Sequence, residues 1–486
     1  MSRRWYQLGG PEPRRWFTAR RAKLLGGGVL LVLAGLLLGI QVQRLWALLP
    51  VVAGAGCVGL ATLPAPAAAR LGQVVSDVLR RPVARWGGWD SYDPSLDRCP
   101  FWLRGSREVS VAPGDGTAGE VGLLDHGDAL SAVLEIEGDG AGIRPDHEHA
   151  RLEHAVGEVL RSLGRASVPV SQVDVVSRAV PARGRHQRWL TDSLADQVPP
   201  AVRESMEQLS RQAEETAETI TTYLVVRMPA GRLAAAARER GAQMSPETVP
   251  EQALRTVGTV SALLAEHGIR VRRALSPVEK AALVRSVWVP SHDADDQTGI
   301  DPDSFWAAWP RYDARRDATV ATGTAGDQWW HATASVPRAG FPQQPVLGRW
   351  LEPLVLAPEV WWRLVTTKFR LLPAVEALAV ARDQQTTAGA RKVHEQTSGE
   401  VATGVVDDEL SVGQVLISDV ARSGQGGVAV SVHLLVTGSS AQQLARFRDE
   451  AERIFGQEMS GRALAWADNR HTPGVLAALP LGLEVT

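Results

Sequence analysis

Two uncharged apolar stretches near the N-terminus constrain this chain more than any other feature of its sequence. They cover residues 24–40 and 45–63, and neither contains Asp, Glu, Lys or Arg. A helix needs about 20 apolar residues, and at least about 17, to cross the hydrocarbon core of a bilayer. Residues 41–44 leave room only for a tight turn between the two stretches. The pattern therefore predicts a transmembrane helical hairpin.

The basic residues beside these stretches predict the orientation of the hairpin. The turn carries only Arg44, whereas the flanking segments are rich in arginine. The flanking basic residues are Arg3, Arg4, Arg14, Arg15, Arg20, Arg21, Lys23, Arg70, Arg80, Arg81 and Arg85. Because basic residues stay on the cytoplasmic side, we expect a two-pass protein of the inner (plasma) membrane with both termini in the cytoplasm.

Two other interpretations of the apolar stretches remain open. The small residues at 65–69 (APAAA) are compatible with signal peptidase cleavage, although a signal peptide has a single apolar region of about 7–15 residues. A buried helical hairpin inside a soluble core would also be apolar on all sides. Both alternatives would remove the membrane anchor.

Beyond the apolar stretches, the sequence is typical of a folded globular protein. Apolar residues make up 44% and charged residues 22%, which is enough to bury a core. The net charge of −2 gives no general attraction to nucleic acid or anionic lipid. Cys57 and Cys99 are the two cysteines, so a disulfide framework is not expected.

Strand-like and helix-like segments alternate from about Trp89 onward, and the pattern occurs twice. Apolar runs predict strands at 107–124 (interrupted), 130–136, 168–176, 219–228, 269–275, 329–336, 361–370, 427–436 and 462–466. Spacing and capping residues predict helices after Pro145–Asp146 and at 202–217, 251–267, 277–288, 347–355 and 375–400, and one capped by Ser439 or Ser440 that ends at 455. We therefore predict an α+β fold in which a cytoplasmic domain of two ferredoxin-like mixed α/β halves follows the hairpin.

The same pattern predicts four regions along the chain. They are 1–92 (basic N-terminus, hairpin and juxtamembrane segment), 93–292 (first α+β half), 293–326 (linker) and 327–486 (second α+β half). The linker is assigned to an acidic, loop-like stretch.

No motif in the sequence predicts a catalytic, cofactor or metal site. The phosphate-binding G-x-x-x-x-G-K-[ST] pattern is absent, the turn at 437–440 is explained by helix capping, and the glycines at 138–142 lack the dinucleotide-binding spacing. No G-x-S-x-G sequence occurs, and nothing marks Cys99 as a reactive thiol.

Three charged clusters carry weak alternatives. His149 and His154 lie five residues apart, so they point to different sides of a helix, and the Asp146–Glu153 cluster fits an acidic helix start better than a zinc site. The aspartates at 293–303 do not match an EF-hand loop. Arg178, Arg183, Arg185 and Arg188 with Trp189 form a basic stretch, but no nucleic-acid-binding module accompanies it, so direct binding is not expected.

Several local patterns resemble proteins of conjugation systems. They are 130–137 running into a glycine turn, 274–277 continuing to 289–290, 330–333 continuing through Pro337 to 351–354, and the tail at 475–482. The hairpin resembles small PrgI-type membrane proteins of Gram-positive conjugation systems. The remainder is similar to the N-terminal, non-ATPase portion of conjugation-type secretion ATPases. Together they resemble an actinobacterial membrane family encoded with type IV secretion-like clusters.

This resemblance implies a function without catalysis, because the motor domain of those ATPases has no counterpart here. We expect a membrane-anchored scaffold of a conjugative, type IV secretion-like apparatus for DNA or protein transfer. Its expected partners are the lipid bilayer, a separate motor ATPase, other membrane components and further copies of itself. The alternatives are a membrane assembly component of a type VII secretion system and an enzyme whose site is built from scattered residues.

Overall fold

The computed structural model describes most of the chain beyond residue 106. The described residues are 107–112, 119–137, 146–165, 167–182, 199–302, 310–313, 315–323, 325–337, 348–357, 359, 361–398, 411, 414, 417–418, 426–459, 463–468 and 471–483. All of them belong to the unit of the chain that includes Asp90–Thr486. The predicted hairpin at 24–63 lies outside the described residues. Within these residues, no helix is both long enough and apolar enough to cross a membrane.

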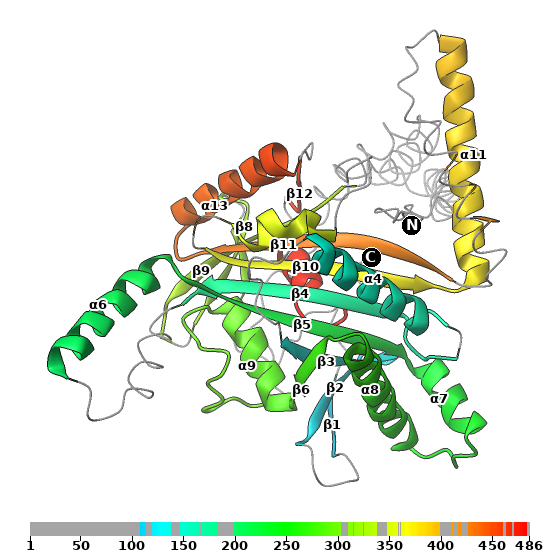
Figure 1. Cartoon of the computed structure of the whole chain (residues 1–486), viewed down its shortest axis with the longest axis horizontal. Coiled ribbons are helices and arrows are strands. Elements are labelled where there is room, and N and C mark those ends of the chain that lie inside the picture. Colours follow the sequence, from blue (N-terminus) through cyan, green and yellow to red (C-terminus); the bar gives the residue numbers. More distant parts are fainter. Residues whose placement is uncertain are drawn as a thin grey trace, which may run out of the picture. The chain divides into compact units, whose positions relative to one another are not determined.

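One large antiparallel sheet organises the described part of the chain (Figure 1). It has 12 strands, and ten of them follow the order β1-β2-β3-β5-β4-β10-β11-β9-β8-β7, while β6 and β12 pair with β3 and β9. Every described pair of strands is antiparallel. The predicted α+β class is therefore confirmed, with one antiparallel sheet shared by both halves.

The first half contains β1 to α9. Its strands are β1 (Arg107–Val111), β2 (Val121–Asp125), β3 (Ala129–Glu137), β4 (Gln172–Pro181), β5 (Glu218–Pro229) and β6 (Arg270–Ala274). Its helices are α4 (Asp146–Leu163), α6 (Pro200–Thr216), α7 (Ala230–Glu239), α8 (Thr248–Glu266) and α9 (Pro277–Trp288). Helix α9 begins where the sequence predicts, because Ser276 and Glu279 form a capping box and Pro277 takes the first turn.

The second half contains β7 to α14. Its strands are β7 (Arg311–Asp313), β8 (Ala318–Thr322), β9 (Gln328–Ser335), β10 (Trp362–Leu372), β11 (Gly427–Gly438) and β12 (Ala465–Trp466). Its helices are η5 (Gly348–Leu351), α10 (Glu352–Val355), α11 (Ala374–Ser398), α13 (Ala441–Arg453), the π-helical turn η6 (Ile454–Glu458) and α14 (His471–Ala478).

The two halves repeat the same register about the seam between β4 and β10. Val176 of β4 lies opposite Thr366 of β10. This pair belongs to a row of residues that lie directly opposite one another on neighbouring strands. On the side of β4 the row continues through Tyr223, Glu135 and Arg273, and on the side of β10 through His433, Ser335 and Ala465. The row therefore crosses β5, β3 and β6 in the first half and β11, β9 and β12 in the second. The halves are related by a pseudo-two-fold axis through the seam.

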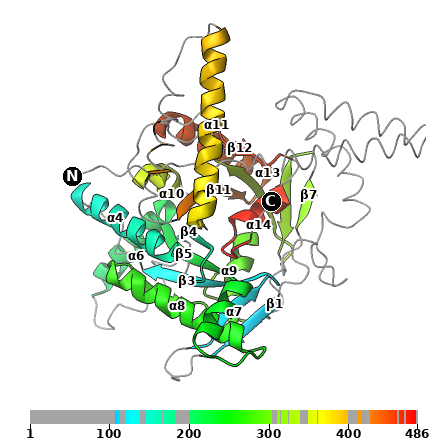
Figure 2. The same cartoon turned by 90° about the vertical axis from the view of Figure 1, so that its right-hand side faces the viewer.

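Both faces of the sheet are covered, which explains why its strands are apolar at most positions. On one face, a single core combines α9, α14 and strands of both halves. On the other face, α4 and α8 cover the first half, and α10 and α13 cover the second half. Figure 2 shows α14 and α4 on opposite sides of the strands.

The C-terminal helices of the two halves reach across the seam. Ser131 Oγ on β3 donates a hydrogen bond to the Leu481 carbonyl, which follows α14 (2.7 Å). His331 on β9 lies 3.0 Å from the Trp288 carbonyl at the end of α9. Ser131 and His331 hold corresponding positions, each four residues before the row member Glu135 or Ser335. Each central strand is thus bonded to the terminal helix segment of the other half.

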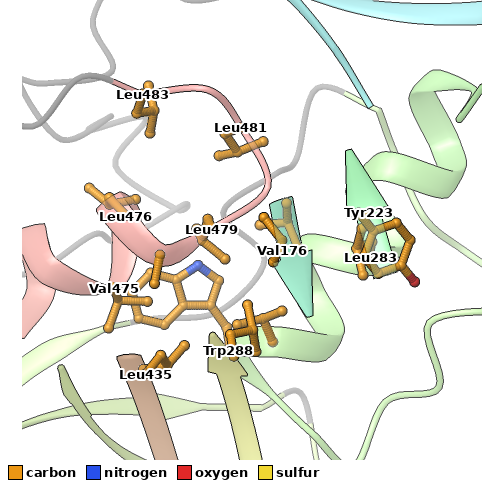
Figure 3. Packing of buried hydrophobic residues seen from close by; sticks show 14 of the residues in the cluster. Val176, Tyr223, Leu283, Trp288, Leu435, Val475, Leu476, Leu479, Leu481 and Leu483 are labelled. Atoms are coloured by element: carbon orange, nitrogen blue, oxygen red, sulfur yellow. The ribbon is translucent and has the colours of Figure 1, made fainter. Parts of the chain in front are cut away.

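The segment after α14 packs directly on this seam. Leu479 and Leu481 are fully buried in the core shared by the two halves, beside Val176 and Trp288 (Figure 3). Thr366 Oγ1 donates to the Ala478 carbonyl (2.6 Å), and Lys368 Nζ donates to the Leu483 carbonyl (2.7 Å). We call residues 479–483 the C-terminal strap.

The structure also corrects some sequence predictions. The expected linker at 293–326 contains β7 and β8, which form the outer hairpin of the second half. Helices α7 and α14 were not predicted. Helix α14 lacks an amphipathic pattern because most of its side chains are buried, and Pro473 and Gly474 interrupt its sequence.

Candidate functional site

Two carboxylates and an imidazole meet where the outer hairpin of the second half approaches α14. Asp317 lies in the β7–β8 turn, Asp468 follows β12, and His471 begins α14. One ligand-type atom of each lies within 4.8 Å of the other two. His471 is fully buried, with Nε2 3.6 Å from Asp317 Oδ2. Asp317 adopts a left-handed backbone (φ 46°), which is uncommon for a residue with a side chain.

The hydrogen bonds of His471 determine which of its nitrogens carries the proton. The backbone N–H of Thr333 donates to His471 Nδ1 (2.9 Å), so Nδ1 must present its lone pair. A neutral imidazole has one N–H, and it must therefore be on Nε2, facing Asp317. A metal-bound Nε2 would need the proton on Nδ1, where it would face the Thr333 N–H, so this imidazole presents an N–H and not a lone pair at Nε2. The buried Nε2 makes no hydrogen bond, because Asp317 Oδ2 lies 3.6 Å away.

The two carboxylates of this cluster have different partners. Asp317 Oδ1 accepts a hydrogen bond from the Tyr312 hydroxyl (2.6 Å). The Asp468 side chain is 60% exposed; partial desolvation, and then the hydrogen bond and charge of Asp317, raise its pKa above the usual value, while the charges of Arg448 and His471 act in the opposite direction. Arg448 of α13 approaches Asp468 Oδ1 from the other side (3.4 Å) and lies over the Trp466 ring. Asp468 is therefore placed between a carboxylate and a guanidinium.

Other buried titratable groups are engaged in structural contacts. Lys280 of α9 pairs with Glu108 of the edge strand β1 (2.7 Å), and burial lowers the pKa of Lys280. His331 donates from Nε2 to the Trp288 carbonyl and accepts at Nδ1 from the Thr437 hydroxyl (2.9 Å). Both partners of His331 belong to the protein core, so neither nitrogen is directed at a substrate.

His126 forms a similar internal contact. Its Nε2 lies 3.0 Å from Ser131 Oγ, whose hydroxyl proton is already directed at the Leu481 carbonyl. His126 must therefore donate to Ser131, which is the opposite of the proton transfer that a nucleophilic serine needs. Burial and the charge of Arg227 lower the pKa of His126 to about 4.

Two long helices, by contrast, carry apolar side chains on their exposed surfaces. They connect the paired strands next to the seam, α6 between β4 and β5 and α11 between β10 and β11, and they extend from opposite ends of the sheet (Figure 1). On α6, Val202, Met206 and Leu209 are exposed at helical spacing, and Leu209 is 60% exposed. On α11, Val375 is 81% and Val393 59% exposed. The contiguous stripe on α6 is typical of protein interfaces, whereas the two valines of α11 lie 18 residues apart.

The charged clusters considered in the sequence have structural roles wherever they are described. His154 pairs with Glu158 on α4 (3.5 Å), and the side chains of 146–150 lie outside the described residues. Asp293 and Asp296 accept backbone N–H bonds from Asp295 and Thr298, as in Asx turns. Asp303 lies outside the described residues, as does Cys99.

The remaining sequence candidates follow the same pattern. Ser440 caps α13 by accepting from the Gln443 N–H, as the turn at 437–440 predicts. Arg178 is buried on β4 and donates to Ser286, so it does not extend an exposed basic patch, and 183–189 lie outside the described residues. The cluster around Asp317 was not predicted, because its three members are far apart in the sequence.

Comparisons with known proteins give no relative from which a role could be transferred. No model of a known protein family matches the chain, and no curated protein is similar to it at a significant level. The fold and its surfaces therefore carry the functional argument.

Proposed function

We propose that this protein is a non-enzymatic, membrane-anchored scaffold of a conjugative, type IV secretion-like transfer apparatus. The main support in the structure is the contrast between its interior and its helices. The buried titratable groups described above are directed at internal partners, whereas α6 and α11 present apolar side chains to the outside. Such an arrangement suits docking better than catalysis.

The fold is also compatible with the resemblance in the sequence. We propose that each half is a ferredoxin-like unit, because the strand orders β6-β3-β5-β4 and β12-β9-β11-β10 place helices after the first and third strands of each unit. The pair would then form one platform on the cytoplasmic side, held at the inner membrane by the hairpin at 24–63.

In this proposal, α6 docks the separate motor ATPase of the apparatus. A variant with Met206→Ser and Leu209→Ser removes two exposed apolar side chains and leaves the core unchanged. The matched control carries Gln208→Ser and Arg211→Ser on the same helix. The full chain is purified in detergent with the conjugation-type ATPase of the same host, and the captured ATPase is measured. We expect the apolar variant to capture about tenfold less ATPase, and the control variant to capture as much as the unmodified chain.

Two results would contradict the proposal. One is a full chain that is purely monomeric and captures no ATPase; the other is capture that the apolar variant leaves unchanged. Capture of the membrane core of a type VII system instead would favour the alternative function. A fractionation experiment tests the anchor separately: the full chain should resist alkaline extraction from membranes, and a variant lacking 24–63 should not.

A further inference from the structure

We propose that Asp317, Asp468 and His471 form a pH-sensitive latch that ties the outer hairpin β7–β8 to the start of α14. The hairpin lies at one edge of the sheet, and β7 has only three residues. An edge hairpin of this length depends on side-chain contacts for its position. The latch supplies such contacts, and its strength depends on one proton.

In the protonated state, Asp317 is the acceptor at the centre of the cluster. It accepts from the Tyr312 hydroxyl of its own hairpin, it faces the Nε2–H of His471, and it faces Asp468. A protonated Asp468 adds a second hydrogen-bond donor beside the Tyr312 hydroxyl, because one carboxyl group then gives its proton to the other carboxylate. Three segments of the chain, the β7–β8 turn, the link after β12 and α14, converge on one charged group.

In the ionised state, the two carboxylates repel each other and Asp468 has a different partner available. The charged and titratable groups that face Asp468 are Asp317 and Tyr312 from the hairpin, His471 from α14, and Arg448 from α13. Arg448, whose guanidinium is always charged, approaches Asp468 Oδ1 from the side of α13 (3.4 Å). Loss of the proton therefore shifts Asp468 from the hairpin toward α13.

The direction in which pH acts on the latch follows from the raised pKa of Asp468. A carboxyl group with a raised pKa in the folded protein stabilises the closed state when it is protonated, and this contribution is lost as the pH rises through that pKa. The hairpin is thus held more tightly below the raised pKa of Asp468 than above it.

Hydrogen exchange of the full chain tests the latch. We measure the protection of 310–323 in detergent from about pH 4, the ordinary pKa of an aspartate, to about pH 8. The protection is corrected for the intrinsic rate and divided by that of the central strands β4 and β5. The ratio should fall as the pH rises. Asp468→Asn, which keeps a donor but has no charge, should hold the ratio at its acid value, and Asp449→Asn on α13 is the matched control.

Three outcomes would overturn the latch. The first is a protection ratio that does not change with pH in the unmodified chain. The second is a protection ratio that changes with pH in Asp468→Asn as much as it does in the unmodified chain. The third concerns a cation: if EDTA removes the protection at high pH and Zn²⁺ or Ca²⁺ restores it, the cluster is a metal site and not a proton-sharing latch.

Discussion

At the scale of single residues, the buried pair of Glu108 and Lys280 shows how strongly one contact can control stability. Their side chains are 4% and 1% exposed and 2.7 Å apart, and they join the edge strand β1 to α9. Tyr312 is the residue of β7 that corresponds to Glu108 of β1. Glu108 lies opposite Leu124 of β2, and Tyr312 lies opposite Thr319 of β8. Glu108 attaches its hairpin to α9 directly, whereas Tyr312 bonds Asp317 within its own hairpin.

We predict that Glu108→Ala destabilises the protein by about 3–5 kcal/mol, because Lys280 would remain buried without its partner. Replacing both residues, with Glu108→Leu and Lys280→Met, should be neutral or stabilising by about 1–4 kcal/mol. Denaturant unfolding followed by tryptophan fluorescence measures both. If the free energy of unfolding of Glu108→Ala lies within about 1 kcal/mol of that of the unmodified chain, the pair is not desolvated as described.

At the scale of elements, two glycines in helices differ in the space that surrounds them. Gly474 of α14 packs on β9, and a Cβ at this position would overlap Thr333 Oγ1. Gly258 of α8 is exposed, and a Cβ there meets nothing within 4 Å. The same substitution should therefore have effects of opposite sign.

We expect Gly474→Ala to destabilise the protein by about 1–3 kcal/mol through overpacking. Gly258→Ala should stabilise it by about 0.4–1 kcal/mol, because alanine reduces the conformational entropy of the unfolded chain. Thermal unfolding of the two variants in parallel measures both effects. Equal shifts in melting temperature would mean that α14 does not approach β9 as closely as the structure shows.

The sequence predicted those elements whose local signals agree with their environment. Strands β3, β5 and β11 are apolar runs with turn residues nearby, and Ser276 marks the start of α9. Helix α14 was not predicted because a helix buried on most sides has no amphipathic period. Strand β7 was not predicted because three residues are too few to show a hydrophobic pattern. The cluster of Asp317, Asp468 and His471 could not be predicted, since only the folded sheet brings these residues together.

At the scale of the whole molecule, three histidines, His331 fully buried and His126 and His433 partly buried, should make the fold sensitive to acid. Burial lowers the pKa values of His126, His331 and His433 to about 4. In the unfolded chain a histidine titrates near 6.5, so between about pH 6.5 and about pH 4 the unfolded state binds more protons than the folded state. Stability is fully present above this range and decreases as the pH falls through it.

Each histidine can contribute up to about 3 kcal/mol to this loss. We therefore predict that the denaturant midpoint falls steadily from pH 7 toward pH 4, and that His433→Gln makes the decrease shallower. Unfolding curves at several pH values measure the slope. This global effect is opposite in sign to that of Asp468, so the two can be separated.

The bond between Ser131 and Leu481 joins residues 350 positions apart in the sequence. During synthesis at about 5–20 residues per second, β3 would wait roughly 20–70 s before its partner leaves the ribosome. Throughout that interval the apolar surface that the C-terminal strap later covers stays open to water and to other nascent chains. Production of this protein in the cell should therefore depend on chaperones that shield a half-built sheet, and a slower ribosome should increase that dependence.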